Sequence, residues 1–167
     1  MNRIILGICG SIAAYKTPEL IRLLVDKEYK ITPILTKSAL QFVTETTIGV
    51  LSNETTYTDK SQFDTNTLHI ALSRQADQFV IAPATANVIA KIANGIADDL
   101  LTSSFLSFTG KKLIVPAMHT EMYENETTKK NIKKLKKLGI AVLDPTDGNL
   151  ACGDKGKGRM QEPNIIV

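Results

Sequence analysis

The sequence contains no tryptophan and only two cysteines, Cys9 and Cys152, among its 167 residues. Two distant thiols are too few for a disulfide framework or a cysteine-rich zinc site, so we expect free thiols and no metal site. The sequence also lacks an apolar run long enough to span a bilayer and the pattern of a secretory signal. These absences predict a cytoplasmic protein without a membrane partner.

An excess of charge of one sign is also missing, because 20 Lys and Arg residues stand against 17 Asp and Glu residues, a net charge of +3. This balance gives no reason to expect a nucleic-acid partner. The lysines between 129 and 137 are most simply the solvated face of a helix, near whose C-terminus positive charge is favourable. With 43% hydrophobic and 22% charged residues, the composition is that of a globular protein, and the length fits one domain over residues 1–167.

Apolar runs alternate with helical patterns along the whole chain. The runs predict strands over 3–9, 31–36, 79–82, 112–115 and 140–143. The segments between them predict helices over 12–27, 85–95, 98–108 and 121–138, one or two short helices over 36–50, a short helical turn over 69–76 and a polar loop over 53–67. Strands that alternate with helices in this way predict an α/β layer sandwich with a central parallel sheet.

The region from about 146 to 160 departs from this alternation, since it holds four of the ten glycines. Such a composition predicts a mobile loop, and long glycine-rich loops in compact domains often act as lids. We therefore expect a flap over a binding site here.

Small and polar residues follow three of the predicted strands, at Gly10-Ser11, 36–38 and 84–87. Ligands bind at the carboxyl ends of parallel strands, where small residues let backbone N–H groups approach a phosphate. The patterns G-x-G-x-x-G and G-x-x-x-x-G-K-[ST] are both missing, which disfavours dinucleotide and Walker-type sites. A mononucleotide such as FMN fits better, while the alternative is that these residues form ordinary turns.

Four segments resemble, in order, the motifs of the flavin-dependent cysteine decarboxylase family. They are 10–16, 82–102, Pro116-Ala117-Met118-His119, and 151–160, the last of which is similar to the flap of the coenzyme A branch of that family. The resemblance covers essentially the whole chain. One position departs, because the family usually has Asn where this sequence has His119.

This resemblance implies a Rossmann-like three-layer sandwich that binds FMN between subunits and assembles as a trimer or a dodecamer. It also implies decarboxylation of 4′-phosphopantothenoylcysteine to 4′-phosphopantetheine in coenzyme A biosynthesis. FMN would oxidise the cysteinyl group to a thioaldehyde, CO₂ would leave, and the resulting enethiol would be reduced. A fused or separate phosphopantothenate–cysteine ligase would be a partner, so the chain could be a complete enzyme or the first half of a longer one.

The resemblance also assigns roles to individual residues. His69 would act as the base in the oxidation, and Cys152 would donate a proton in the reduction. The residues expected to bind FMN are Gly10, Ser11, Ile12, Thr36, Ser38, Ala84, Thr85, Ala86, Asn87, Ala117 and Met118. The residues expected to bind substrate are His119, Asn149, Leu150 and Ala151. A histidine at 119 can still donate a hydrogen bond to the substrate carboxylate that the usual Asn would hold.

Two other functions match parts of the pattern. A peptidyl-cysteine decarboxylase is disfavoured by the flap sequence 151–154, which is similar to the coenzyme A branch. A non-catalytic flavin-binding regulatory subunit would lack the flap cysteine or the histidine, and this chain keeps both.

Three further side chains have structural interpretations. Cys9 is expected to be a small buried hydrophobe. Asp98 and Asp99 could form an acid–base pair, but we expect Asp98 to cap a helix and Asp99 to make a structural bond.

Overall fold

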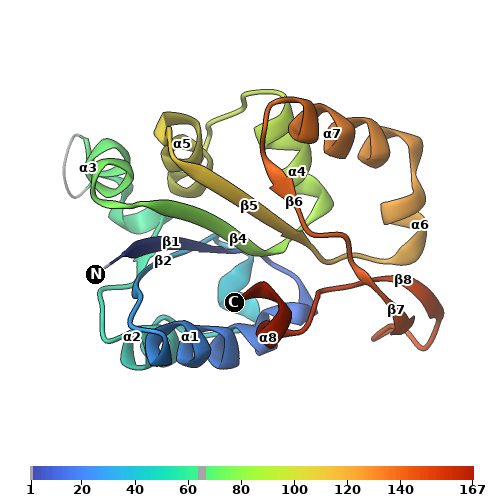
Figure 1. The fold of residues 1–167 in the computed structure, drawn as a ribbon, viewed down its shortest axis with the longest axis horizontal. Helices are drawn as coiled ribbons and strands as arrows, with labels where there is room; N and C mark the ends of the chain where they lie inside the picture. The colour runs from blue at the N-terminus through green and yellow to red at the C-terminus, as the bar shows by residue number, and fades with distance from the viewer. Residues whose placement is uncertain (1, 64–66) are drawn as a thin grey trace.

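The computed structural model describes residues 2–63 and 67–167, and it places six parallel strands in one sheet (Figure 1). The strand order is β3-β2-β1-β4-β5-β6. The bounds are β1 (Arg3–Ile8), β2 (Lys30–Leu35), β3 (Tyr57–Thr58), β4 (Gln78–Ala84), β5 (Lys111–Pro116) and β6 (Ala141–Val142). The prediction of an α/β fold with a central parallel sheet is confirmed.

Helices cover both faces of this sheet. One face carries α1 (Thr17–Asp26), α2 (Glu45–Ser52) and the C-terminal α8 (Pro163–Ile166). The other face carries α3 (Leu68–Gln75), α4 (Ala86–Ala93), α5 (Leu100–Ser107) and α7 (Glu126–Lys137). None of the described helices is long and apolar enough to cross a bilayer.

The hydrophobic core consists of two clusters, one on each face of the sheet. Successive residues of β1 alternate between them, with Ile5 in one cluster and Leu6 in the other, and both are fully buried. This burial on both faces explains why the first strand is a continuous apolar run. Phe79 packs edge-on against Phe105, with ring centroids 5.1 Å apart.

The predicted helix over 12–27 is divided in two. A 3-10 helix (Ile12–Lys16) comes first, and α1 begins with Pro18 in its first turn. Proline lacks an N–H, so it is accommodated only where the helix needs no donor. The division leaves a short, tight turn directly after β1.

The prediction of one helix over 121–138 was wrong, because α6 (Thr120–Glu124) ends before α7 begins. Asn125 has an extended conformation and its side-chain oxygen accepts a hydrogen bond from Thr127 N–H at 2.9 Å. An asparagine in this role starts a new helix, and helical periodicity does not reveal it. The predicted loop over 53–67 also contains β3 and a 3-10 helix (Asp59–Phe63), while residues 64–66 lie outside the described residues.

The roles expected of Asp98 and Asp99 are exchanged. The Asp99 carboxylate caps α5 by accepting from Thr102 N–H at 2.7 Å, and the Thr102 hydroxyl accepts from Asp99 N–H at 3.2 Å. Asp98 instead pairs with Lys91 at 2.7 Å. The two neighbours are equivalent as cap candidates in the sequence. In the structure Lys91 of α4 contacts both carboxylates, since it also lies 3.4 Å from Asp99, but of the two only Asp99 accepts from the first N–H groups of α5.

The glycine-rich region 146–160 is a hairpin of two antiparallel strands, β7 (Thr146–Asn149) and β8 (Lys155–Arg159), instead of a loop without regular structure. Its base is fixed, because Met118 N–H donates to Gly158 C=O at 3.0 Å. A Cβ at Gly158 would collide with the Met118 carbonyl oxygen, so this glycine permits a close backbone contact.

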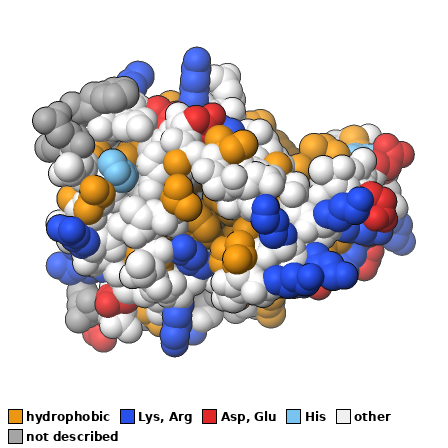
Figure 2. All heavy atoms as spheres, turned by 90° about the horizontal axis from the view of Figure 1, so that it is seen from above, with side chains coloured by type: hydrophobic (Ala, Val, Ile, Leu, Met, Phe, Trp, Pro, Cys, Tyr) orange, Lys and Arg blue, Asp and Glu red, His pale blue; other side chains and the backbone are white. Residues whose placement is uncertain are grey.

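The lysines of α7 are exposed, as the sequence predicted, and basic side chains gather over this end of the molecule (Figure 2). The exposed lysines are 129, 130, 133, 134, 136 and 137. Lys129 pairs with Glu124 at 2.7 Å, and Lys136 pairs with Asp144 at 3.2 Å.

The two cysteines are expected to differ sharply in reactivity. Cys9 is fully buried at the end of β1, and burial raises its pKa to about 12, whereas Cys152 is exposed. At pH 8 only roughly one Cys9 side chain in ten thousand is then a thiolate. Iodoacetamide should therefore label Cys152 alone in the native protein and both cysteines after unfolding, as peptide mass spectrometry can measure. Equal labelling rates in the native protein would contradict this burial.

Candidate functional site

The carboxyl ends of β1, β2 and β4 meet at one edge of the sheet, because β1 pairs in register with both neighbours. A cavity of about 390 Å³ opens there. Gly10 touches Ser38, and a Cβ at Gly10 would collide with that side chain. The glycine therefore allows the first two strand ends to approach one another.

The lining of this cavity combines hydrogen-bond donors suited to a phosphate with the carboxylates of Asp59, Asp98 and Asp99. Within residues 2–63 and 67–167, the backbone N–H groups of Gly10 and Ser38 have no hydrogen-bond acceptor. The first N–H groups of α4 are open, as at any helix N-terminus. The Thr85 hydroxyl caps α4 by accepting from Val88 N–H at 3.3 Å. Open N–H groups beside the positive end of a helix dipole favour a bound phosphate, so the donor set fits FMN.

A second cavity of about 500 Å³ lies between the 3-10 helix after β1, the segment after β5 and the tip of the hairpin. All four residues expected to contact substrate line it, together with Cys152. They are His119, Asn149, Leu150 and Ala151. Gly10 lines the first cavity and Ser11 the second, so this turn lies between the two.

The residues expected to bind FMN are divided between the two cavities. The first cavity is lined by Gly10, Thr36, Ser38, Thr85 and Asn87. The second is lined by Ser11, Ile12, Ala117 and Met118. Of the remaining two, Ala84 is fully buried at the end of β4, and Ala86 begins α4.

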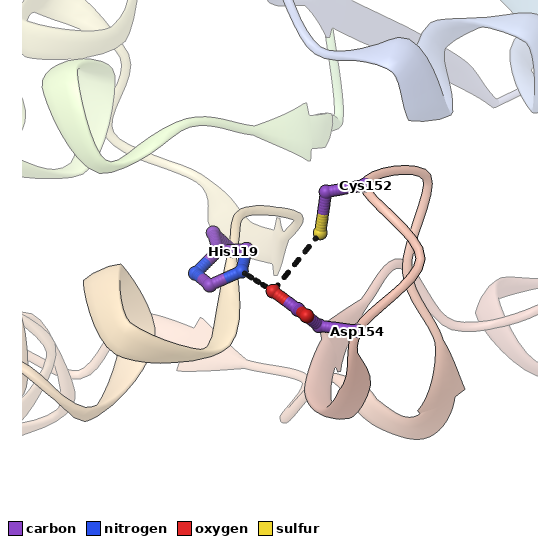
Figure 3. Close-up of side chains that lie close together, drawn as sticks. All are labelled: His119, Cys152 and Asp154. Atoms are coloured by element: carbon purple, nitrogen blue, oxygen red, sulfur yellow. Dashed lines mark hydrogen bonds and ion pairs between the residues drawn. The ribbon is translucent and has the colours of Figure 1, made fainter.

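His119 lies beside two side chains of the hairpin tip (Figure 3). Its Nε2 is 2.9 Å from Asp154 Oδ2, and the Cys152 thiol donates to the same oxygen at 3.5 Å. His119 Nδ1 accepts a hydrogen bond from Glu121 N–H at 3.3 Å. A ring nitrogen that accepts carries no proton, so the proton is at Nε2 and is donated to Asp154.

The ligand atoms of His119, Cys152 and Asp154 all lie within 4.8 Å of one another, a spacing also found among metal ligands. Coordination through Nε2 would require a lone pair on that atom and a proton on Nδ1. The hydrogen bond from Glu121 N–H to Nδ1 opposes this tautomer. The three side chains therefore form a hydrogen-bonded network.

Asp154 is a residue of this network that sequence reasoning did not single out. The hydrogen bond from His119, followed by that from Cys152, holds the pKa of its carboxyl below the usual range. Its place in the flap motif, two residues after Cys152, was the available signal.

Lys16 was also missed. It lines the second cavity with only 8% of its surface exposed, and its ammonium donates to Glu162 at 2.7 Å. This ion pair joins the turn after β1 to the segment that follows the hairpin.

His69 is the one expected catalytic residue that lies far from the hairpin. It belongs to α3, at the opposite end of the molecule's long axis from β7 and β8 (Figure 1). Its backbone carbonyl accepts from the Ser73 hydroxyl at 2.7 Å. One copy of the chain therefore does not bring His69 and Cys152 together.

Known proteins of similar sequence were found for the whole chain. The model of the family described as Flavoprotein matches residues 1–167. The chain is 43% identical to the coenzyme A biosynthesis bifunctional protein CoaBC of Bacillus subtilis, over 99% of this chain but 41% of that protein. It is 40% identical to a probable phosphopantothenoylcysteine decarboxylase of Streptococcus mutans, over 99% of this chain and 95% of that protein. The chain thus spans about two fifths of the bifunctional relative.

Solved structures with the same fold also cover nearly the whole chain. A PPC decarboxylase with a cysteine-to-serine change, complexed with pantothenoylaminoethenethiol, superposes with a TM-score of 0.91 at 35% identity, covering 99% of this chain and 93% of the other. The FMN-binding protein AtHal3 superposes with a TM-score of 0.87 at 35% identity, and the match covers 99% of this chain and 92% of AtHal3. With this fold, this cradle of strand ends and a match over the full length, the chain belongs to the flavoprotein family, and its relatives include a probable phosphopantothenoylcysteine decarboxylase.

Proposed function

We propose that this chain is an FMN-dependent decarboxylase that converts 4′-phosphopantothenoylcysteine to 4′-phosphopantetheine. The observation that carries the proposal is the second cavity, which collects His119 and Cys152 beside a cradle of strand ends suited to a phosphate. The name of the Streptococcus mutans relative and the ligand of the superposed PPC decarboxylase support the choice of substrate.

The cofactor phosphate would be held by the open N–H groups of Gly10 and Ser38 and by the first turn of α4. When bound, FMN supplies two-electron chemistry, taking electrons from the substrate and returning them later. The turn between the two cavities would place the flavin ring toward Ala117 and Met118, which line the substrate cavity.

The remaining chemistry belongs to side chains of the second cavity. The His119 Nε2–H would donate a hydrogen bond to the substrate carboxylate, a group of the same kind that it binds in this structure. Cys152 would donate its proton to carbon, so that a C–H bond forms, the S–H bond breaks, and the thiolate regains a proton from water. The hairpin serves as the substrate flap within one domain over residues 1–167.

The site is completed by a second copy of the chain. His69 lies at the opposite end of the molecule from Cys152, so a base at this position would reach only a neighbour's cavity. We therefore propose a homo-oligomer, a trimer or a dodecamer built from trimers, in which each site combines His69 of one copy with Cys152 of another. The ligase reaction would come from a separate chain or from a fused region of the kind suggested by the longer bifunctional relatives.

The purified protein is expected to be yellow and to hold FMN. Mixed with 4′-phosphopantothenoylcysteine, it should release CO₂ and form 4′-phosphopantetheine, measured by gas release and mass spectrometry. A peptide that ends in cysteine should release none, because it lacks the pantothenoyl group. Release from the peptide alone would replace this function with a peptidyl-cysteine decarboxylase.

The change Cys152→Ser separates the two halves of the reaction. An alcohol is a weaker acid than a thiol by several pKa units, so serine is a poor proton donor. The variant should still release CO₂, while formation of 4′-phosphopantetheine falls by about a hundredfold or more. Mass spectrometry should detect the enethiol, two hydrogens lighter than the normal product. Normal formation of 4′-phosphopantetheine would remove Cys152 from the reaction.

Co-assembly of two variants that each fail to form 4′-phosphopantetheine tests the shared site. His69→Asn and Cys152→Ser subunits, mixed under conditions that let subunits exchange, should regain formation of 4′-phosphopantetheine in sites that combine the two intact residues. Random mixing in equal amounts restores about a quarter of the sites in a ring of heterologous interfaces. Activity no greater than the sum of the separate variants would place both residues in one copy.

A further inference from the structure

Asp154 accepts hydrogen bonds from both functional side chains at the edge of the substrate cavity, His119 and Cys152. Its Oδ2 lies 2.9 Å from His119 Nε2 and 3.5 Å from Cys152 Sγ (Figure 3). The lowered pKa of Asp154, caused first by the hydrogen bond from His119, keeps this carboxyl ionised at neutral pH. An ionised carboxylate only accepts hydrogen bonds, so His119 and Cys152 both donate to it.

His119 has a single N–H to offer. Glu121 N–H donates to His119 Nδ1 and thereby keeps the ring proton at Nε2. That proton is directed at Asp154, so a carboxylate from the protein itself fills the position proposed for the substrate carboxylate. Two carboxylates would also repel each other at this one donor.

The hairpin is built so that its tip can move while its base stays in place. The base is fixed by the hydrogen bond from Met118 N–H to Gly158 C=O and by the lack of room for a Cβ at Gly158. The Asp154 side chain is 67% exposed, and hydrogen-bonded pairs with an exposed partner contribute little stability. The contact between the tip and His119 is therefore easily broken and remade.

Cys152 and Asp154 belong to one small turn. Leu150 N–H donates to Asp154 C=O at 2.7 Å, and Gly153 N–H donates to Leu150 C=O at 3.0 Å. Because these backbone bonds close the turn on itself, a movement of the whole hairpin tip displaces the Asp154 carboxylate and the Cys152 thiol together.

We propose that Asp154 is a positioning residue whose carboxylate competes with the substrate carboxylate for His119 Nε2–H. Bound substrate takes the N–H and releases the hairpin tip. When CO₂ leaves, the N–H is free again, Asp154 returns to it, and Cys152 is brought to the cavity. The inference rests on the proposed function and adds an order of events, in which the proton donor is positioned only after the carboxylate has gone.

The test measures binding to the FMN-loaded oligomer by titration calorimetry. One ligand is 4′-phosphopantothenoylserine, which keeps the carboxylate but has no thiol, and the other is 4′-phosphopantetheine, which has no carboxylate. Asp154→Asn should lower the Kd of the serine compound by about two- to fivefold, the range expected when a weak exposed competitor is removed. The Kd of 4′-phosphopantetheine should stay unchanged.

Two further variants separate competition from simple charge effects. Asp147→Asn removes the same charge from an exposed position on β7 of the same hairpin, and it should leave both Kd values unchanged. His119→Ser keeps a good helix cap for α6 but is too short to reach Asp154. In the His119→Ser background, Asp154→Asn should no longer affect binding of the serine compound.

The return of Asp154 is tested on the products. During turnover, Asp154→Asn should release a larger share of the enethiol than the wild-type protein, because Cys152 is positioned less well. Equal changes in both Kd values, a tightening that persists with His119→Ser, or an unchanged share of enethiol would overturn the competition. Absence of CO₂ release by the wild-type protein would instead overturn the proposed function.

Discussion

Burial of β1 on both faces is the constraint from which the candidate site follows. Ile5 packs into one core cluster and Leu6 into the other, so a shift of one residue would exchange the two faces. β1 and β2 end together at the pair Ile8–Leu35, and β4 continues from its last pair with β1, Gly7–Ile81, to Ala84. The cavity with the open N–H groups lies where these neighbouring strand ends meet.

Glycine at the strand ends and in the hairpin acts through size more than through flexibility. Gly10 brings the ends of β1 and β2 into contact, and Gly158 lets β8 rest on the backbone after β5. A methyl group at either position would separate elements that must touch. The glycine-rich composition that predicts a mobile loop thus produces a hairpin anchored by the hydrogen bond from Met118 N–H to Gly158 C=O.

The polar groups of the site are arranged by hydrogen bonds that leave few alternatives. A backbone N–H sets the tautomer of His119, and the remaining ring N–H finds a carboxylate at 2.9 Å. The buried ammonium of Lys16 is matched by Glu162 at 2.7 Å. The pairs His119–Asp154 and Lys16–Glu162 join segments far apart in the sequence, so the chemistry of the cavity depends on how the hairpin and the C-terminal segment dock.

The order of strands and helices, the parallel sheet and the family could be predicted from the sequence, because apolar periodicity and motif spacing report on neighbours along the chain. The same holds for the small residues of Gly10-Ser11 and 84–87, which mark the strand ends. The break at Asn125, the choice of Asp99 over Asp98 as a cap, and the contact of His119 with Asp154 could not be predicted. Each of these three features depends on which hydrogen-bond partner a polar side chain finds. Some of these partners come within hydrogen-bond distance only when the chain folds. Asp154, for example, lies 35 positions from His119 in the sequence.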